Sequence, residues 1–284
     1  MPDFSIVDSH LHIWDPSRLP YRWLNGHETL GRAYLLPDYD EAVDGVDVSK
    51  MVFVECDIDP GHALDEIAWV DEVALQDPRI AAYVAHAPVE TGDAIAPLLE
   101  RLQDFSKMRG VRRLIQGETQ AGFCVQPKFI QGVQALERFG WSFDICILGW
   151  QMDDAISLVD ACPNVQFILD HIGKPRIIDG ALQPWARQMS ALAERENVVC
   201  KLSGVATEAD HQSWKASDLS PFIQTALQSF GPQRLMFGGD WPVATQAIDA
   251  RSWISCVDDE VGSLSEDEKR CLFLDVAAET YRLD

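Results

Sequence analysis

The sequence predicts a single-domain (β/α)8 TIM barrel of the α/β class, and three observations lead to this prediction. The chain has 284 residues, close to the roughly 250 residues that one such barrel needs. Eight short apolar runs alternate with longer helical patterns, which is the order of parallel βαβ units. No linker rich in Gly, Ser or Pro and no internal repeat divides the chain. We therefore expect one domain over residues 1–284.

The expected strands are short runs rich in Val, Ile, Phe and Leu, mostly without polar alternation. Such runs are typical of strands buried on both faces, as in a parallel sheet. They are Phe4–Val7, Lys50–Glu55, Ile80–Ala85, Gly110–Leu114, Ser142–Ile147, Val165–Leu169, Val198–Leu202 and Leu235–Phe237.

The expected helices fill the gaps between these strands. Pro127 suits a first helical turn, and Ser265 with Glu268 forms a capping box that marks the start of the last helix. The long irregular segment Trp14–Leu36 follows the first strand, a place where a functional loop is expected. The helices are Ala63–Gln76, Asp93–Phe105, Pro127–Phe139, Asp153–Ala161, Pro184–Glu196, Leu219–Phe230, Ala247–Val261 and Ser265–Arg282.

Charge and cysteine content narrow the class of protein. The formal net charge of -22 disfavours binding to nucleic acid and to anionic membranes. Seven cysteines without a CxxC pair indicate small buried side chains in a reducing compartment. The N-terminus lacks a signal-peptide pattern, and no run of about 18 apolar residues exists. We expect a cytoplasmic protein without nucleic-acid or membrane partners.

Reactive residues follow three of the expected strands. Active sites of such barrels lie at the carboxyl ends of the strands. His10 and His12 follow the first strand two residues apart, so both imidazoles can face one point and bind a metal. His171 follows the sixth strand, and Asp240 follows the eighth strand, where a carboxylate can shuttle a proton or ligate a metal. Each alone has a structural alternative, such as a core histidine or a turn-forming aspartate, but together they predict a hydrolytic site.

Basic residues fall at the same predicted rim, where they can bind a carbonyl or carboxylate group or form ordinary ion pairs. Glu55 and His86 also lie at strand ends, where each either contacts the ligand or has a purely structural role. The basic residues are Arg112, Arg113, Lys174, Arg176 and Lys201. The roles of Glu55, His86, Arg113, Arg176 and Lys201 stay open at this point.

The opening motif Asp8-Ser9-His10-Leu11-His12-Ile13-Trp14-Asp15-Pro16 resembles that of the lactonase-like branch of the amidohydrolase superfamily. This branch contains L-fuconolactonase, L-rhamnonolactonase and 2-pyrone-4,6-dicarboxylate lactonase. Further matches span nearly the whole chain in order: Tyr21-Arg22-Trp23-Leu24, Arg109-Gly110-Val111-Arg112-Arg113, Leu169-Asp170-His171-Ile172-Gly173-Lys174-Pro175, Lys201-Leu202-Ser203-Gly204 and Phe237-Gly238-Gly239-Asp240-Trp241-Pro242.

The resemblance implies a distorted barrel that hydrolyses a C–O or C–N bond, above all that of a lactone. His10, His12, His171 and Asp240 would then surround the reacting water and carbonyl, with Asp240 moving the proton. The oxyanion would be stabilised by a metal, or by the histidines and Arg112. Lys174, Trp23 and Tyr21 would position the substrate.

The resemblance leaves the cofactor open. The fourth strand carries arginines where binuclear members of the superfamily carry a metal-bridging lysine. The site would therefore hold a single divalent ion, zinc or manganese, on His10, His12, His171 and Asp240, or it would be metal-free.

Several functional alternatives also remain. The substrate is a sugar-derived aldonolactone or a carboxylated lactone, and the latter needs two or more of the basic residues turned inward. A metal-dependent decarboxylase or amide hydrolase would use the same barrel. A catalytically idle barrel that binds a metabolite would be favoured if the four central residues lay more than about 8 Å apart. The expected partner is a small-molecule lactone. Whether the chain forms a homodimer stays open.

Overall fold

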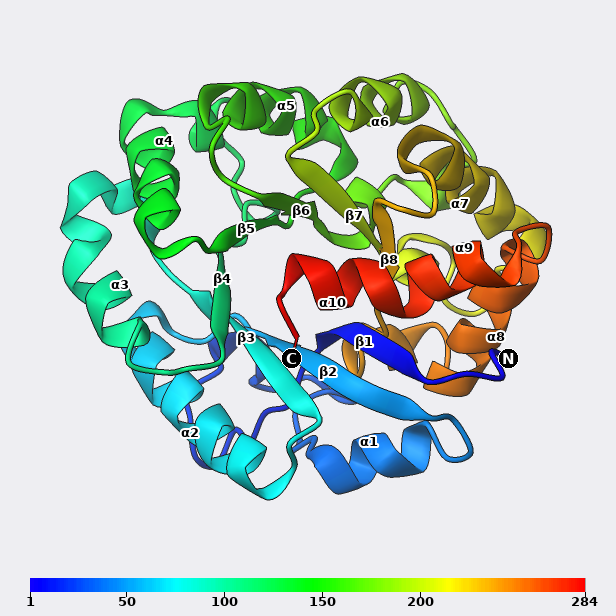
Figure 1. The fold of residues 1–284 in the computed structure, drawn as a ribbon, viewed down its shortest axis with the longest axis horizontal. Helices are drawn as coiled ribbons and strands as arrows, with labels where there is room; N and C mark the ends of the chain where they lie inside the picture. The colour runs from blue at the N-terminus through cyan, green and yellow to red at the C-terminus, as the bar shows by residue number, and fades with distance from the viewer. Residues whose placement is uncertain (284) are drawn as a thin grey trace.

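The computed structural model describes residues 1–283 and contains one eight-stranded parallel sheet in the sequential order β1 to β8 (Figure 1). The sheet closes between β1 and the segment after β8, where Leu11 bridges Trp241 and the amide of Asp240 donates to the carbonyl of His10 at 2.8 Å. The predicted barrel is confirmed. The strands are β1 Ile6–Leu11, β2 Val48–Val54, β3 Ile80–His86, β4 Met108–Arg112, β5 Ser142–Ile145, β6 Phe167–Leu169, β7 Val198–Leu202 and β8 Leu235–Phe237.

Most of the helices form an outer ring around these strands (Figure 1). The predicted capping box is present, since the Ser265 amide donates to Glu268 Oε2 at 2.9 Å and the Glu268 amide donates to Ser265 Oγ at 3.3 Å. The α-helices are α1 Leu36–Ala42, α2 Ala63–Gln76, α3 Ala96–Leu102, α4 Pro127–Gln134, α5 Met152–Ala161, α6 Trp185–Ala193, α7 Ala216–Phe230, α8 Ala250–Glu260, α9 Glu266–Arg270 and α10 Val276–Thr280.

Two sequence-based assignments around the first strand were wrong. The strand extends over Ile6–Leu11 instead of Phe4–Val7, so His10 lies within it. Its polar residues interrupt the apolar run, yet all of them are buried in the structure. The short helix α1 was not expected, because it begins with Leu36-Pro37 at the end of the segment assigned to a loop.

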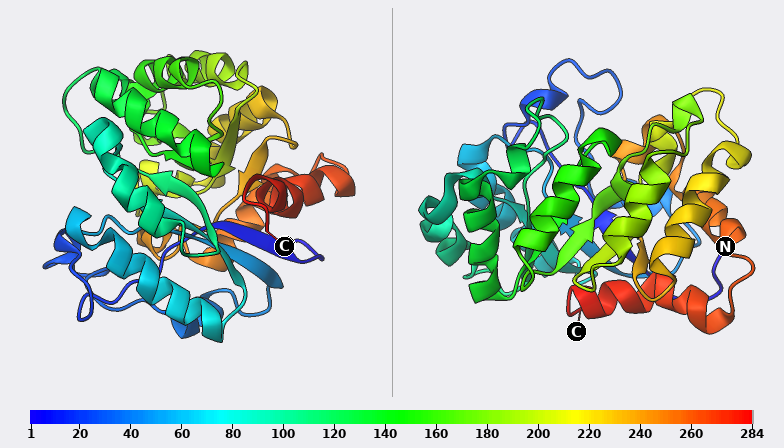
Figure 2. Two further views of the ribbon diagram at one scale, coloured as in Figure 1. Left: turned by 60° about the vertical axis from the view of Figure 1, so that its left-hand side comes forward. Right: turned by 90° about the horizontal axis from the view of Figure 1, so that it is seen from above.

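The core consists of two apolar layers. One layer packs the outward faces of the strands against the helices. The other fills the barrel interior and joins inward-facing Val7, Ala82 and Met236 to Ala277 and Tyr281 of the C-terminal segment. Figure 2 (right) shows α9 and α10 along one end of the barrel and the loop that follows β1 at the opposite end. The C-terminal segment therefore closes the end of the barrel that faces away from this loop.

Two expectations from composition can be compared with the structure. Within residues 1–283, none of the helices combines the length and the apolar character needed to cross a bilayer. All seven cysteines are free thiols, and five of them are buried, as expected for small apolar side chains.

Candidate active site

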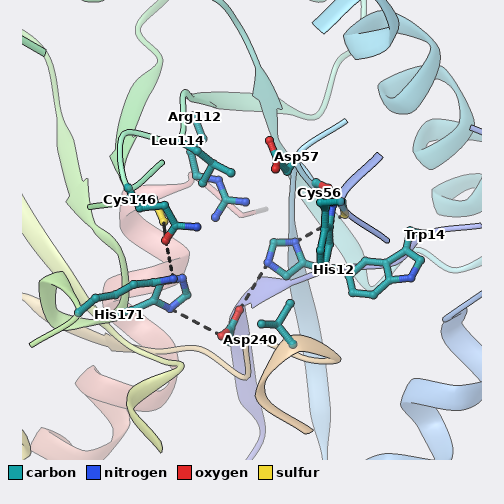
Figure 3. A pocket seen from close by; sticks show the side chains of 13 residues that line it. His12, Trp14, Cys56, Asp57, Arg112, Leu114, Cys146, His171 and Asp240 are labelled. Atoms are coloured by element: carbon teal, nitrogen blue, oxygen red, sulfur yellow. Dashed lines mark hydrogen bonds and ion pairs between the residues drawn. The ribbon is translucent and has the colours of Figure 1, made fainter. Parts of the chain in front are cut away.

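A cavity of about 300 Å³ opens at the carboxyl ends of the strands (Figure 3). Six of the predicted site residues line it: His12, Trp23, Arg112, His171, Lys174 and Asp240. The residues Trp14, Cys56, Asp57, Leu114, Gln116, Cys146 and Val243 complete its wall. His12, His171 and Asp240, from the ends of β1, β6 and β8, thus share this rim, whereas the predicted site residue His10 is completely buried and does not line the cavity.

His10 and His12 meet at the end of β1. Both rings are almost completely buried, and their Nε2 atoms lie 3.1 Å apart. The Nδ1 atom of His12 lies 2.8 Å from the carbonyl oxygen of Val54. Because a carbonyl only accepts hydrogen bonds, His12 carries its proton on Nδ1 and, when neutral, turns the lone pair of Nε2 toward His10.

Asp240 lies between the histidines. Its Oδ1 is 3.5 Å from Nε2 of His12 and 3.8 Å from Nε2 of His10, and its Oδ2 is 4.0 Å from Nδ1 of His171. Burial alone would raise the pKa of Asp240, but His171, His12 and His10 more than offset this and hold the pKa below its usual value. The carboxylate is therefore an anion at neutral pH.

The turn after β8 depends on glycine. A Cβ atom at Gly239 would lie 2.5 Å from Oδ2 of Asp8. The Asp8 carboxylate accepts the amides of Gly239 at 2.7 Å and of His10 at 3.0 Å, so it joins β1 to this turn. Asp240 itself has a φ of 52°, a left-handed conformation that non-glycine residues rarely adopt.

His171 completes the group from the end of β6. Its Nδ1 lies 2.9 Å from the Ser203 hydroxyl, and its ring centroid lies 4.5 Å from that of His10. Burial lowers the pKa of His171 to about 4, so the ring is neutral at pH 7. The four central residues thus lie within one substrate's reach of each other, which counts against the idle barrel.

The donor set fits a divalent cation. One nitrogen each from His10 and His12 and one oxygen from Asp240 form a triangle with sides of 3.1, 3.5 and 3.8 Å. Tetrahedral zinc with ligand bonds of about 2.0–2.1 Å places its ligand atoms roughly 3.3 Å apart. His171 forms a second potential ligand group with His10 and Asp170. The predicted four-residue set is thus divided between two overlapping groups.

The guanidinium of Arg112 lies beside His10, and two carboxylates balance its positive charge. Its guanidinium donates to Glu55 Oε1 at 2.7 Å and to Asp170 Oδ2 at 3.2 Å, and its Nη1 lies 3.3 Å from Nε2 of His10. Burial alone would lower the pKa of Arg112, but Glu55 and Asp170 raise it well above its ordinary value. Glu55 therefore serves as the ion-pair partner of Arg112, and His86 lies 4.0 Å from its other oxygen.

The residues expected to position substrate do not all reach the cavity. Lys174 lines it, and its ammonium donates to Gln116 Oε1 at 2.7 Å. Trp23 also lines it and donates its indole N–H to the carbonyl of Cys56 at 2.8 Å. Tyr21 is buried outside the cavity wall, because its ring packs into the apolar core.

Three of the basic residues expected near the rim also lie outside the cavity wall. Arg113 pairs with Glu90 at 2.9 Å and Glu118 at 2.5 Å. Arg176 pairs with Asp179 on the surface at 2.6 Å. Lys201 is completely buried inside the barrel and contacts Asp144 at 2.6 Å and Asp170 at 3.1 Å.

Two acidic residues near the site escaped the sequence-based prediction. Asp57 lines the cavity two residues after Glu55 with a φ of 53°, and its position after a predicted strand was the available signal. Asp144 lies inside an apolar strand and is completely buried. A carboxylate within such a run signals a buried ion pair, because an unpaired buried charge is costly.

The fold and this cluster define a barrel enzyme whose histidines and aspartate converge on one cavity at the carboxyl ends of the strands. A model of the amidohydrolase family (Amidohydro_2) matches residues 7–283. This chain belongs to the amidohydrolase family, and the resemblance read from the sequence motifs is confirmed.

Individual relatives agree with this placement. An L-fucono-1,5-lactonase of Burkholderia multivorans is 34% identical over 292 residues, with 98% of this chain and 96% of the relative covered. An L-rhamnono-gamma-lactonase of Scheffersomyces stipitis is 24% identical over the full length of both chains. The crystal structure of an amidohydrolase from Burkholderia multivorans with bound zinc has a TM-score of 0.88 and 32% identity, and covers 99% of this chain and 100% of its own.

Proposed function

We propose that this protein hydrolyses a lactone, and that its preferred substrate is a neutral aldonolactone. The observation that carries the proposal is the position of Asp240, an anionic carboxylate at the cavity wall with His10 and His12 on one oxygen and His171 on the other. The similarity to proteins named L-fucono-1,5-lactonase and L-rhamnono-gamma-lactonase supports the same reaction.

The two oxygens of Asp240 suit a proton shuttle. Asp240 accepts a proton from water as the water oxygen bonds to the lactone carbonyl carbon. When the tetrahedral intermediate collapses, the ring C–O bond breaks and Asp240 returns the proton to the leaving alkoxide. The product is a hydroxy acid, which ionises at neutral pH and releases one proton per turnover. Because Oδ1 faces His12 and Oδ2 faces His171, one oxygen can keep its contacts while the other takes the proton.

Positive charge near the carbonyl oxygen stabilises the oxyanion. The guanidinium of Arg112 lines the cavity and stays charged through its pairing with Glu55 and Asp170. His10, His12 and Asp240 would hold a divalent ion, which when bound polarises the carbonyl as a Lewis acid.

The charge balance of the cavity favours a neutral substrate. Among the described residues, only Arg112 and Lys174 of the five predicted basic residues line the cavity, and Arg112 is already paired with two carboxylates. Asp57 adds a carboxylate to the wall, which repels a carboxylated lactone and accepts hydrogen bonds from sugar hydroxyls. Trp14 and Trp23 offer apolar surface to the sugar ring.

A substrate panel tests the proposal. Aldonolactones and 2-pyrone-4,6-dicarboxylate would be offered with and without a chelator, and proton release and carbon dioxide would be measured. We expect proton release with aldonolactones and at least 10-fold lower kcat/KM for the dicarboxylate. Carbon dioxide release from a carboxylated substrate without lactone opening would favour the decarboxylase. No turnover of any lactone, with or without added metal, would overturn the proposal.

A further inference from the structure

Backbone strain in this protein is concentrated at the cavity. Among residues 1–283, six residues other than glycine have a positive φ, and four of these six line the cavity. Such left-handed conformations are unfavourable for residues with a Cβ atom, so they persist only where surrounding contacts enforce them. The contacts that enforce them therefore bear on the geometry of the site. The six residues are Asp57, His171, Ile172, Lys174, Asp240 and Arg282.

Three of the six residues belong to one turn directly after β6. Positive φ values of 54°, 48°, 73° and 47° follow one another at His171, Ile172, Gly173 and Lys174. The amide of Lys174 donates to the carbonyl of His171 at 2.9 Å across this left-handed turn. Because a turn of this kind has three residues, the side chains of His171 and Lys174 lie on the same side, and both line the cavity. Ile172 between them is completely buried in the apolar core.

The four residues of the turn do not favour this conformation by themselves. A right-handed backbone is the default for residues with a Cβ atom, and a β-branched residue such as Ile172 is especially unfavourable at positive φ. Gly173 alone adopts a positive φ freely, and a Cβ atom there would lie 2.4 Å from Cε of Met152. The turn therefore depends on contacts from outside its own sequence.

Two hydrogen bonds from other segments hold the turn. Trp185, the first residue of α6, donates its indole N–H to the carbonyl of Ile172 at 2.9 Å. The amide of Gly149, in the loop after β5, donates to the carbonyl of Lys174 at 3.0 Å. A Cβ atom at Gly149 would lie 3.2 Å from this carbonyl oxygen, so glycine permits the close approach. The middle and the end of the turn are thus each fixed by a neighbouring segment.

The indole of Trp185 is itself held in place. The side chain is 4% exposed, and its ring packs against Phe222 of α7 with the centroids 5.4 Å apart. The same arrangement recurs after β8, where Trp253 of α8 donates its indole N–H to the carbonyl of Gly238 at 2.9 Å, two residues before Asp240. In both cases the helix that follows a strand supplies an indole N–H to the turn that carries site residues.

We propose that Trp185 is a positioning residue, which holds the carbonyl of Ile172 so that the left-handed turn directs His171 and Lys174 together into the cavity. Trp185 does not line the cavity and acts only through the turn. The effect on turnover rests on the proposed lactonase function, whereas the hold on the turn does not.

Amide hydrogen exchange tests the turn without any substrate. Trp185→Phe keeps an aromatic ring but removes the indole N–H. Trp214→Phe is the matched control, because Trp214 also donates its indole N–H to a backbone carbonyl, that of Ala247 at 2.9 Å, and does not line the cavity. In Trp185→Phe we expect the amides of Lys174 and Gly149 to exchange roughly 3- to 10-fold faster, the effect of losing one neutral hydrogen bond.

Trp214→Phe should keep the wild-type exchange rates at both amides. Wild-type rates in a folded Trp185→Phe protein would overturn the proposal, and so would an equal acceleration in Trp214→Phe. If exchange changes as expected but the wild-type protein opens no lactone, the proposed function fails and the role of Trp185 in the turn stands.

Kinetics test whether the turn acts through its two cavity residues. In Trp185→Phe we expect kcat/KM for the best aldonolactone to fall roughly 10-fold, since a misplacement of about 1 Å can cost about 100-fold. Part of this loss should be a higher KM through Lys174. In a Lys174→Met background the same substitution should therefore raise KM no further. General destabilisation would instead reduce the amount of active enzyme at an unchanged KM, and an equal rise of KM with and without Lys174 would also overturn the proposal.

A second variant tests the other end of the turn. Gly149→Ala pushes against the carbonyl of Lys174, and Gly61→Ala is its control, because a Cβ atom at Gly61 meets no atom within 4 Å. Gly149→Ala should raise KM and accelerate exchange at Lys174 as Trp185→Phe does, whereas Gly61→Ala should change neither. If Gly149→Ala accelerates exchange but leaves kcat and KM at the wild-type values, the turn does not position the cavity residues and the proposal fails.

Discussion

His10 and His12 present their Nε2 atoms to each other at 3.1 Å, and both rings are almost completely buried. His12 has its Nδ1 proton on the Val54 carbonyl, so its Nε2 is a lone pair when the ring is neutral. A hydrogen bond between the two Nε2 atoms therefore needs a proton on Nε2 of His10. The Nδ1 atom of His10 can then accept from the Lys201 ammonium at 3.3 Å. A divalent ion bound here would replace the Nε2 proton of His10.

Binding of zinc or manganese should stabilise the protein through these histidines. A ligand that binds only the native state at 100 times its Kd adds about 2.7 kcal/mol to the free energy of unfolding, which thermal denaturation in metal and in chelator detects as a higher Tm. His12→Gln should lose most of this increase. His62→Gln, which removes a surface histidine paired with Asp65, should keep it. A wild-type Tm that neither metal nor chelator changes would favour the metal-free site.

Asp240→Asn should lower kcat by roughly 10²–10⁴-fold, the usual contribution of a general acid–base residue. Asparagine tolerates the left-handed backbone at this position better than alanine does, so the variant tests chemistry with little change in Tm. Activity would be measured by proton release with the best aldonolactone. Full lactonase activity in a folded Asp240→Asn protein would contradict the assigned role.

Much of the fold was readable from the sequence because buried parallel strands are apolar and barrel helices are amphipathic. The end of β1 was misjudged because Asp8, Ser9 and His10 are polar, and sequence alone does not reveal that Asp8 accepts the amide of Gly239 from the far end of the chain. His171 and Asp240 could be selected from the sequence because each follows an apolar run, and active-site residues of such barrels lie where the strands end.

What the sequence could not show are the partners across the barrel. Lys201 follows an apolar run like any rim cation, but its depth and its pairing with Asp144 depend on which strands are neighbours and where each side chain points. Tyr281 is separated from Asp144 by 137 positions along the chain. Lys174 and Arg176 are two residues apart, yet one lines the cavity and the other lies on the surface, a difference set by local loop geometry.

Asp57 should contribute to the choice of a neutral substrate. Asp57→Asn keeps the side-chain shape and tolerates the φ of 53°, but it removes the charge from the cavity wall. We expect kcat/KM for aldonolactones to fall by roughly 10-fold, through the loss of charge-assisted hydrogen bonds to hydroxyls, and discrimination against carboxylated lactones to decrease.

Asp59→Asn is the control for this substitution, because Asp59 lies two residues away and pairs with Arg22 instead of lining the cavity. Asp59→Asn should leave kcat/KM for aldonolactones unchanged. It should also leave the discrimination against carboxylated lactones unchanged. Equal effects of the two substitutions, or an unchanged preference in Asp57→Asn, would remove Asp57 from the specificity of the site.

His171 and His10 should each lower the stability of the metal-free protein as the pH decreases from about 7 to 5. Burial lowers the pKa of His171 to about 4 and that of His10 well below its ordinary value, whereas both histidines titrate near 6.5 in the unfolded chain. Between these values the unfolded state binds more protons than the native state, so the free energy of unfolding rises with pH. At about 1.4 kcal/mol per pKa unit, His171 alone accounts for roughly 2 kcal/mol between pH 6.5 and 5.

Urea unfolding at several pH values in the presence of chelator measures this slope. The lowered pKa values of Asp170 and Asp240 do not interfere, because these carboxylates stay ionised in both states above about pH 5. Burial raises the pKa of Asp144 to about 6, so this carboxyl opposes the histidines over the same range, and the comparison with a histidine variant isolates their contribution. His171→Gln should flatten the curve between pH 7 and 5 without abolishing the dependence, since His10 still contributes. His62→Gln is the control substitution, because it removes a surface histidine that does not line the cavity. Equal slopes for the wild-type and His171→Gln proteins would mean that His171 is not kept neutral by burial, and the neutral ring beside Asp240 would have to be abandoned.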